Sequence, residues 1–426
     1  MKSTPAHTLP QLPLPEPLRG SQPDSFAFRT LSRRLPGIAT RVLNSRDWHD
    51  QARTRLGALV DDMPHGRLRL LDDPQAPDVA AWEADLVPYL GLTWLEAPWY
   101  VSETYFFRRL LEATGYYQAG PGFHLDPFLP EKQQEFEAVY AHSSSLCEHL
   151  DGAAIARNPM RLDNPQAVEQ VRSRLISLLR QNIWGNQADR SMWPAGSRAE
   201  GPSLQNNGRS HEHLLVDHSV RIAEFLTNLP APLHRIDLIL DNGGIELAYD
   251  LVLADIMLSG SFTQKIRLHA KPHPTYVSDV TFPDFYSTIN HLEQAREACL
   301  RALAGRLRGC LADGRIRLRT DYYWTSLRSG WDMPPELHHE LSETSLVISK
   351  GDANYRRWLG DRIWSHTTPI DPILAYFPSP LLILRVLKAN LIAGLENGLS
   401  EKMYRLDPDW LHNGNWGIIQ ATGLPG

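Results

Sequence analysis

Ile236-Asp237-Leu238-Ile239-Leu240-Asp241-Asn242-Gly243-Gly244 is the stretch of the chain that decides its fold. The short apolar run stops abruptly at Asp241, and the two glycines lead into residues 246–258, which have the apolar spacing of a helix. A strand that ends in an acidic, glycine-containing loop and continues into a helix is typical of α/β proteins. Ligands bind such sheets at the carboxyl ends of the strands, so Asp241 and Asn242 are candidate site residues.

The segments on either side continue this pattern. Strands are expected at 265–271, 316–318 and 345–349, with one helix at 286–311. Strands that alternate with helices of this length predict a parallel sheet covered on both faces. Before the sheet, residues from about 40 to 190 carry apolar side chains at three- and four-residue spacing, which predicts helices.

The chain is expected to have three parts. Residues 1–34 are rich in proline and predict an extended, flexible arm without chemistry of its own. Residues 35–200 form a mainly helical region, and residues 201–426 form the α/β core. A stretch rich in Gly, Ser, Pro and Asn at 195–209 is the expected boundary between the last two.

The composition excludes several classes of protein. A hydrophobic content of 42% and a charged content of 22% over 426 residues are those of a globular protein with more than one small core. The net charge of -6 gives no electrostatic basis for nucleic-acid binding, and no apolar stretch approaches the roughly 20 residues of a membrane span. Cys147, Cys299 and Cys310 are odd in number and far apart, so we expect unpaired cysteines and a reducing cytoplasm.

The loop at Asp241 and Asn242 has three interpretations. Its carboxylate and amide oxygens are hard ligands suited to Mg²⁺ or Mn²⁺, and backbone N–H groups at the start of the helix favour a phosphate. An ordinary turn with a helix cap uses the same residue types. A nucleotide-binding loop would need the G-x-G-x-x-G spacing, which is absent after Gly244.

A second acidic segment follows the next predicted strand and contains Lys271 and Asp279. Consecutive strands of a parallel sheet bring their carboxyl ends to one edge, so Asp279 is expected to approach Asp241 and Asn242. Two carboxylates that converge on one spot repel unless a cation lies between them, and Lys271 suits a phosphate oxygen. Alternatively, Asp279 is a helix N-cap and Lys271 is a solvated charge.

Two later segments carry further candidates. Lys350 ends a predicted strand and suits a phosphate, while Asp352 and Asn354 in the following turn suit sugar hydroxyls or the metal shell. Arg385 and Lys388 are three residues apart, which predicts one face of a helix beside an apolar stripe. Buried cations there need an anionic partner, whereas on an exposed face both would be solvated.

Together these segments resemble the damage-control phosphatase family (formerly domain of unknown function 89), and within it the sugar-phosphate phosphatases of subfamily III. A human member has also been described as an acidic-residue (protein glutamate) methyltransferase. The resemblance covers roughly residues 35 to 421, and its motifs are at 240–247, 250–255, 271–279, 350–357 and 385–388.

The resemblance implies a three-layer α/β/α Rossmann-like core with a mainly helical N-terminal region. It also implies a divalent metal (Mn²⁺, Co²⁺, Ni²⁺ or Mg²⁺) and catalysis at Asp241, Asn242 and Asp279. The residues expected to bind the substrate are Glu246, Lys271, Ser278, Lys350, Gly351, Asp352, Asn354, Arg385 and Lys388. Two departures from the family pattern are Val386, where a threonine hydroxyl is usual, and Gly243, where serine or alanine is usual.

The expected function is hydrolysis of a sugar phosphomonoester of the fructose 1-phosphate or fructose 6-phosphate type, in metabolite damage control. The metal would polarise the phosphoryl oxygen and activate water, or Asp241 would act as nucleophile. The expected partner is the small sugar phosphate, with neither nucleic acid nor membrane. The alternatives are an S-adenosylmethionine-dependent protein-glutamate carboxyl methyltransferase and a non-catalytic sugar-phosphate sensor.

Overall fold

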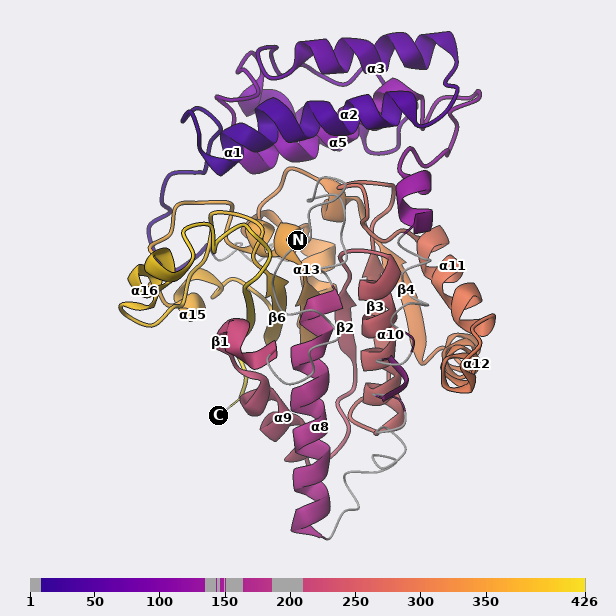
Figure 1. The fold of residues 1–426 in the computed structure, drawn as a ribbon, viewed down its shortest axis with the longest axis vertical. Coiled ribbons are helices and arrows are strands. Elements are labelled where there is room, and N and C mark those ends of the chain that lie inside the picture. Colours follow the sequence, from indigo (N-terminus) through magenta and orange to yellow (C-terminus); the bar gives the residue numbers. More distant parts are fainter. Residues whose placement is uncertain are drawn as a thin grey trace, which may run out of the picture.

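The computed structural model describes residues 9–134, 143, 146–148, 150, 164–185 and 210–425. Its centre is a seven-stranded sheet with the strand order β1-β7-β6-β5-β2-β3-β4. Figure 1 labels β1, β6, β2, β3 and β4 of this sheet. The strands are β1 (Leu214–Asp217), β2 (Ile236–Ile239), β3 (Ile266–Ala270), β4 (Ile316–Thr320), β5 (Leu346–Lys350), β6 (Leu381–Val386) and β7 (Gly417–Thr422).

Five of these strands, β4, β3, β2, β5 and β6, are parallel, as the sequence predicts. The expectation of a wholly parallel sheet is wrong at the other edge, where β7 pairs antiparallel with β6 and β1 pairs parallel with β7. Between β6 and β7 the chain contains only the short helix α16 (Leu399–Leu406), so β7 returns beside β6 in the opposite direction.

The position of β2 defines where a ligand is expected. β2 lies between β3, which follows it in the chain, and β5, which is reached after β4. The chain therefore leaves β2 on one side and returns on the other, which makes the β2–β5 boundary a topological switch point. The carboxyl ends of β2 and β5 open a crevice at such a point.

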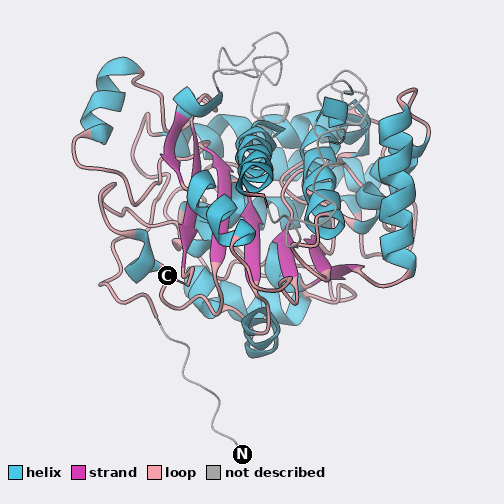
Figure 2. Ribbon diagram, turned by 90° about the horizontal axis from the view of Figure 1, so that it is seen from below, coloured by secondary structure: helices cyan, strands magenta, loops and turns pink. Residues whose placement is uncertain are grey.

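Helices cover both faces of the sheet, which confirms the three-layer α/β/α arrangement (Figure 2). Along β2, Leu238 packs with one helical layer and Ile239 with the other, because successive side chains of a strand point to opposite faces. The first layer contains α8 (Pro165–Trp184), α9 (Ser219–Thr227), α10 (Gly244–Ser259), α11 (Phe282–Glu293) and α12 (Ala298–Ala312). The second contains α13 (Pro335–Ser342), α14 (Asp352–Trp358), α15 (Ile370–Ile373) and α16.

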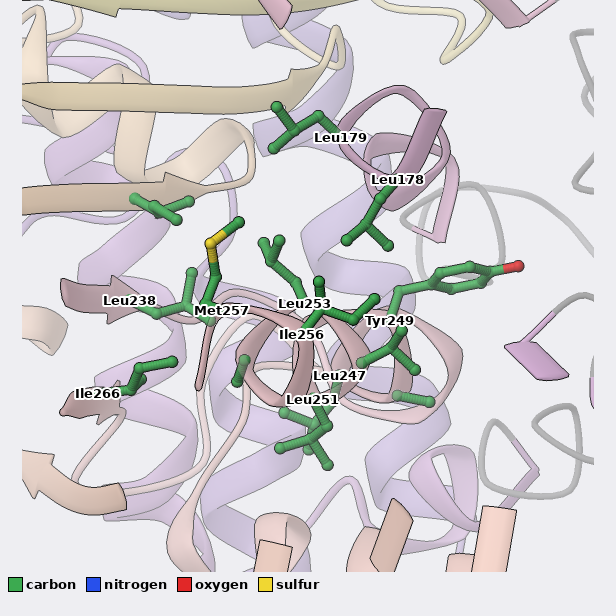
Figure 3. Close-up of a cluster of buried hydrophobic side chains, with 14 of the residues drawn as sticks. Leu178, Leu179, Leu238, Leu247, Tyr249, Leu251, Leu253, Ile256, Met257 and Ile266 are labelled. Atoms are coloured by element: carbon green, nitrogen blue, oxygen red, sulfur yellow. The ribbon is translucent and has the colours of Figure 1, made fainter. Parts of the chain in front are cut away.

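Helix α10 is the centre of the first layer. Leu247, Leu251 and Met257 are buried in the same core as Leu238 of β2 and Leu178 of α8 (Figure 3). Nearly all of α10 is buried, so the charged residues on it need partners inside the protein.

The described N-terminal region is mainly helical, as predicted, and has its own apolar core. Its helices are α1 (Phe26–Arg29), α2 (Leu35–Asn44), α3 (Asp50–Asp62), α4 (Val79–Leu86) and α5 (Trp99–Thr114). Of the 16 residues of α5, 15 are buried, because this helix lies between the outer helices and the core. Figure 1 shows the layer formed by α1, α2, α3 and α5 stacked on one end of the α/β core.

The described part of the proline-rich segment is hydrogen-bonded to the rest of the protein. The Leu18 N–H donates to the carbonyl of Asp361 at 2.8 Å, and the Ile363 N–H donates to the carbonyl of Glu16 at 2.9 Å. The Trp99 N–H donates to the carbonyl of Leu18 at 2.7 Å. Residues 1–8 and the expected boundary at 195–209 lie outside the described residues, and the three-part division remains a prediction.

Three further expectations need correction. The single helix at 286–311 is two helices, α11 and α12, separated at residues 294–297. Arg385 lies in the strand β6 and not on a helix. The prediction was wrong because all residues of Leu381–Val386 are buried, so the sequence there lacks the alternation that marks a half-exposed strand. Cys147 and Cys299 form a disulfide although 152 residues separate them in the sequence. The expectation of a reducing cytoplasm depended on unpaired cysteines, so the disulfide removes that argument. The cytoplasmic location of the protein remains a prediction.

Candidate active site

The backbone brings the two acidic segments together. Asn242 and Asp279 form an antiparallel β-bridge, and the Gly243 N–H donates to the carbonyl of Ser278 at 2.8 Å. Among the side chains, the Ser278 hydroxyl donates to Asn242 Oδ1 at 3.0 Å. The predicted approach of the two strand ends is therefore confirmed. Asp279 is no helix cap, because α11 begins at Phe282 and is capped by Thr281.

Asp241 occupies a strongly anionic environment. Burial raises its pKa well above the usual value, and the charges of Asp279 and Glu246 raise it further. Lys271 and Lys388 act in the opposite direction without cancelling this effect. The loop thus concentrates negative charge in a buried position, which a bound cation would relieve.

Lys271 is buried beside the acidic loop. Its Nζ lies 3.3 Å from Asp279 Oδ2 and 3.5 Å from Asn354 Oδ1, and the residue is only 3% exposed. The alternative that Lys271 is a solvated charge is therefore excluded. Asn354 in turn donates to the carbonyl of Lys350 at 2.8 Å, which fixes the turn after β5.

Lys350 is the centre of a buried network that the sequence interpretation missed in part. Its Nζ lies 3.4 Å from Glu246 Oε1, 3.1 Å from Asp250 Oδ1 and 3.1 Å from the carbonyl of Asn182 on α8. Burial raises the pKa of Glu246 to about 7, although Lys350 lowers it. A signal for Asp250 was available, since it lies one turn after Glu246 on a helix that is apolar almost all round.

Gly351 connects the turn after β5 to the acidic loop. Its φ is +83°, which L-residues with a side chain rarely adopt, and a Cβ built there would lie 1.9 Å from Asp241 Oδ2. The backbone directly after β5 therefore approaches the Asp241 carboxylate closely, at the switch point between β2 and β5. Only glycine permits this approach.

Replacement of Gly351 by alanine is expected to displace the Asp241 carboxylate and to destabilise the protein by roughly 1–3 kcal/mol, a typical cost of a strained backbone conformation. The free energy of unfolding in urea measures the cost. Gly57→Ala is the matched control, because a Cβ on Gly57 of helix α3 meets nothing within 4 Å. Equal stability of the two variants would contradict the close approach.

Arg385 and Lys388 flank Asp352. Arg385 Nη2 lies 2.7 Å from Asp352 Oδ1, and the Lys388 N–H donates to the same oxygen at 3.2 Å. Arg385 is fully buried, and its anionic partner is the carboxylate of Asp352. Of the two alternatives left open by the sequence, a buried cation with an anionic partner and a solvated charge, the structure shows the first. The exposed-helix alternative is wrong for both residues, because Lys388 is only 7% exposed and follows β6 in a loop.

A pocket lies over these residues, and its volume is about 470 Å³ when the solvent space at its opening is included. Five of the predicted site residues line it, namely Asp241, Asn242, Asp279, Asp352 and Lys388. The other predicted residues support this wall from behind or beside it and do not line the pocket: Glu246, Lys271, Ser278, Lys350, Gly351, Asn354 and Arg385.

The opposite wall contains residues that the sequence interpretation did not assign to the site. Arg34 Nη1 lies 3.0 Å from Glu103 Oε1, and Arg356 contacts the other oxygen of Glu103. The Arg356 guanidinium also lies 3.7 Å from the ring centroid of Trp99. The charge of Glu103 within a helix of mostly apolar residues could have marked it as a site candidate. Its partner Arg356, 253 residues away, could not be predicted from the sequence.

The residues available for a metal are two carboxylates and an amide. Within the described ranges, no three side chains of His, Cys, Asp or Glu form a group that could hold a metal ion. Asp241, Asn242 and Asp279 offer a different set, of hard oxygens only, which suits Mg²⁺ or Mn²⁺ completed by water and substrate oxygens.

The whole chain can be compared with known proteins. A family model described as the damage-control phosphatase ARMT1-like domain matches residues 30–403. The chain belongs to this family. Damage-control phosphatase ARMT1 of Danio rerio is 30% identical over 442 residues, which cover 96% of this chain and 97% of the relative. The human protein of the same name is 28% identical, with 96% and 99% covered.

A solved structure is also similar. It is the crystal structure of a DUF89 family protein from Pyrococcus horikoshii, with 14% identity and a TM-score of 0.42. The match covers 91% of this chain and 96% of that one.

Membership of the damage-control phosphatase ARMT1-like family makes the chain a phosphatase of the metabolite damage-control type, and the substrate a small molecule. The family is generally metal-dependent. No helix in the described part of the chain is both long and apolar enough to cross a membrane.

Proposed function

We propose that the chain hydrolyses phosphomonoesters of sugars, of the fructose 1-phosphate or fructose 6-phosphate type, with the help of a divalent cation. The observation that carries this proposal is the meeting of two buried carboxylates and an amide, from separate strand ends, at one wall of a pocket. Lys388 lies on the same pocket wall and supplies positive charge toward a phosphate.

The ligands of the cation would be Asp241, Asn242 and Asp279. Their fit rests on the hard-oxygen donor set. The pKa of Asp241 is raised by burial first and then by the charges of Asp279 and Glu246, which a cation would offset. When bound, Mn²⁺, Co²⁺, Ni²⁺ or Mg²⁺ would polarise the phosphoryl oxygen and provide an activated water.

The chain's own residues would bind and orient the substrate. Lys388 and Arg34 would offset charge on the equatorial phosphoryl oxygens, where fixed donors favour the transition state. Asp352 would accept a hydrogen bond from a sugar hydroxyl. Lys350 was predicted to bind phosphate, and we now propose that it acts instead by holding Glu246 and Asp250 in place behind the pocket.

The proposal is tested by phosphate release from a panel of sugar phosphates, after chelation and after addition of each of the four metals. We expect release from ketose phosphates with at least one metal. Binding of a sugar phosphate without release would favour the sensor, whereas calorimetric binding of S-adenosylmethionine without phosphatase activity would favour the methyltransferase.

Removal of the metal is expected to destabilise the protein, because a ligand that binds only the folded state stabilises that state. A metal at 100 times its Kd stabilises the folded state by about 2.7 kcal/mol, which raises the midpoint of thermal unfolding by a few degrees. Differential scanning fluorimetry with EDTA and with Mn²⁺ measures this change. The Asp279→Asn variant should lose the metal-dependent rise, and the exposed control Asp61→Asn should keep it. A rise of equal size in both variants would place the metal elsewhere.

A further inference from the structure

A second cavity lies beside the active-site pocket, where the N-terminal segment meets the loop after α14. Its volume is about 780 Å³ when the solvent space at its opening is included. Its rim is formed by backbone bridges that join Pro17 to Arg362 and Arg19 to Pro98. Four arginines line it, against a single aspartate among its lining residues, Asp361.

Two of these groups neutralise each other. Arg356 lies 2.8 Å from Asp361 Oδ1 and donates to Asp361 Oδ2 at 3.1 Å. It also contacts Glu103 on its active-site side. Arg19, Arg357 and Arg362 therefore remain as the positive charge of the cavity.

Arg357 differs from the other buried arginines of the described residues. Five arginines in the described residues are buried, and four of them have a carboxylate within 3.1 Å: Arg108, Arg235, Arg356 and Arg385. Arg357 is 2% exposed, but in the described chain no carboxylate lies within 4.0 Å of it. Its guanidinium donates only to neutral oxygens, such as the carbonyls of Arg328 at 2.7 Å and Trp324 at 3.1 Å, and its Nε has no partner there. A buried charge without a counter-ion is costly, so this position favours an anion.

Arg19 and Arg362 extend this charge toward the mouth. Arg362 Nη1 donates to the carbonyl of Pro15 at 2.5 Å, and Arg19 donates to the carbonyl of Glu96. Within the described ranges neither guanidinium forms an ion pair, and Arg362 Nε is buried without a hydrogen-bond partner. The backbone contacts orient both side chains without neutralising them.

We propose that this cavity binds a phosphate group, either as inorganic phosphate or as the phosphoryl group of a phosphorylated metabolite. Arg19, Arg357 and Arg362 place positive charge around one space, and a charge-assisted hydrogen bond from a guanidinium group to a phosphate oxygen is strong. The site differs from the catalytic pocket because it offers no pair of acidic side chains to a metal, and the two share only Arg356.

The test is titration of inorganic phosphate in EDTA, followed by ³¹P NMR line broadening and calorimetry. Without metal, the acidic loop disfavours phosphate in the catalytic pocket, so the remaining binding reports on the cavity. We expect one phosphate per chain, bound at least about tenfold more weakly by the Arg19→Gln/Arg362→Gln variant, since each lost contact is of the charge-assisted kind. Arg53→Gln, an exposed arginine on α3, is the matched control and should bind as the natural chain does.

Three results would overturn the proposal: no binding in EDTA, equal binding by the double variant, or clearly tighter binding by Asp241→Asn, which would place the phosphate in the catalytic pocket. Competition by glucose 6-phosphate in EDTA identifies the source of the phosphate group, because tighter binding than inorganic phosphate indicates a metabolite and weaker binding indicates the free anion. If the thermal midpoint shows that the double variant is misfolded, anomalous scattering from tungstate soaked into crystals of the natural chain replaces it. A peak beside Arg357 is expected, and an empty cavity contradicts the site.

Discussion

Replacement of Asp241 by asparagine is expected to lower kcat/KM for sugar phosphates by about a thousandfold. Loss of one carboxylate from the proposed ligand set weakens metal binding, and the metal is worth several kcal/mol in the transition state, at about 1.4 kcal/mol for each factor of ten. Steady-state phosphate release at saturating Mn²⁺ measures the loss.

The stability of the Asp241→Asn variant in EDTA shows whether Asp241 is a metal ligand or a residue that only supports the fold. Asp241 is buried beside Asp279 and Glu246, and its charge is disfavoured there. In EDTA the Asp241→Asn variant should therefore be at least as stable as the natural chain. Asp61→Asn, on the exposed face of α3, should retain full activity. Near-normal turnover by Asp241→Asn, or its collapse in EDTA, would refute the assigned role.

Replacement of Lys350 by methionine is expected to cost about 3–5 kcal/mol of the free energy of unfolding. Lys350 is fully buried between Glu246 and Asp250, so its loss leaves two buried carboxylates without their cation. Urea unfolding measures this cost. Lys265→Met is the matched control, because the Lys265 side chain is exposed just before β3, and it should change stability by less than about 0.5 kcal/mol.

A double-mutant cycle shows whether the ion pair is the cause. Asp250→Asn in the Lys350→Met background should recover part of the lost stability, because one uncompensated charge is removed. If Lys350 binds phosphate directly, as the sequence suggested, the double variant will fold but its KM will rise strongly. A destabilisation by Lys350→Met below about 1 kcal/mol would contradict the network.

The central part of the fold could be predicted from the sequence because its signals are local. Residues 236–244 combine an apolar run, an abrupt acidic end and two glycines, and each property depends on neighbours in the chain. The convergence of Asp279 with this loop then followed from the geometry of parallel strands. Both expectations are confirmed.

The errors have a physical cause in burial and distance. The six residues of β6 are all buried, so they show neither the alternation of a half-exposed strand nor a helical period. The pairing of Lys350 with Asn182 spans 168 residues, and the disulfide of Cys147 with Cys299 spans 152. Such contacts depend on how whole layers pack, which no local pattern encodes.

The wall of the pocket opposite the acidic loop was missed for the same reason. The sequence predicts only that Trp99 and Glu103 belong to a helix and that Arg34 belongs to a flexible arm. Their approach to Arg356 depends on how the N-terminal helices stack on the carboxyl ends of the strands (Figure 1). The sequence thus predicted the residues on the sheet side of the pocket, and their role as a site remains a prediction.

Anomalous diffraction at the manganese edge, from crystals grown with Mn²⁺, tests the central claim most directly. The account predicts one peak coordinated by oxygens of Asp241, Asn242 and Asp279 at about 2.0–2.6 Å, the range of hard-cation ligands in proteins. A map without a peak at this loop, or an ion held by other residues while these side chains point apart, would contradict it.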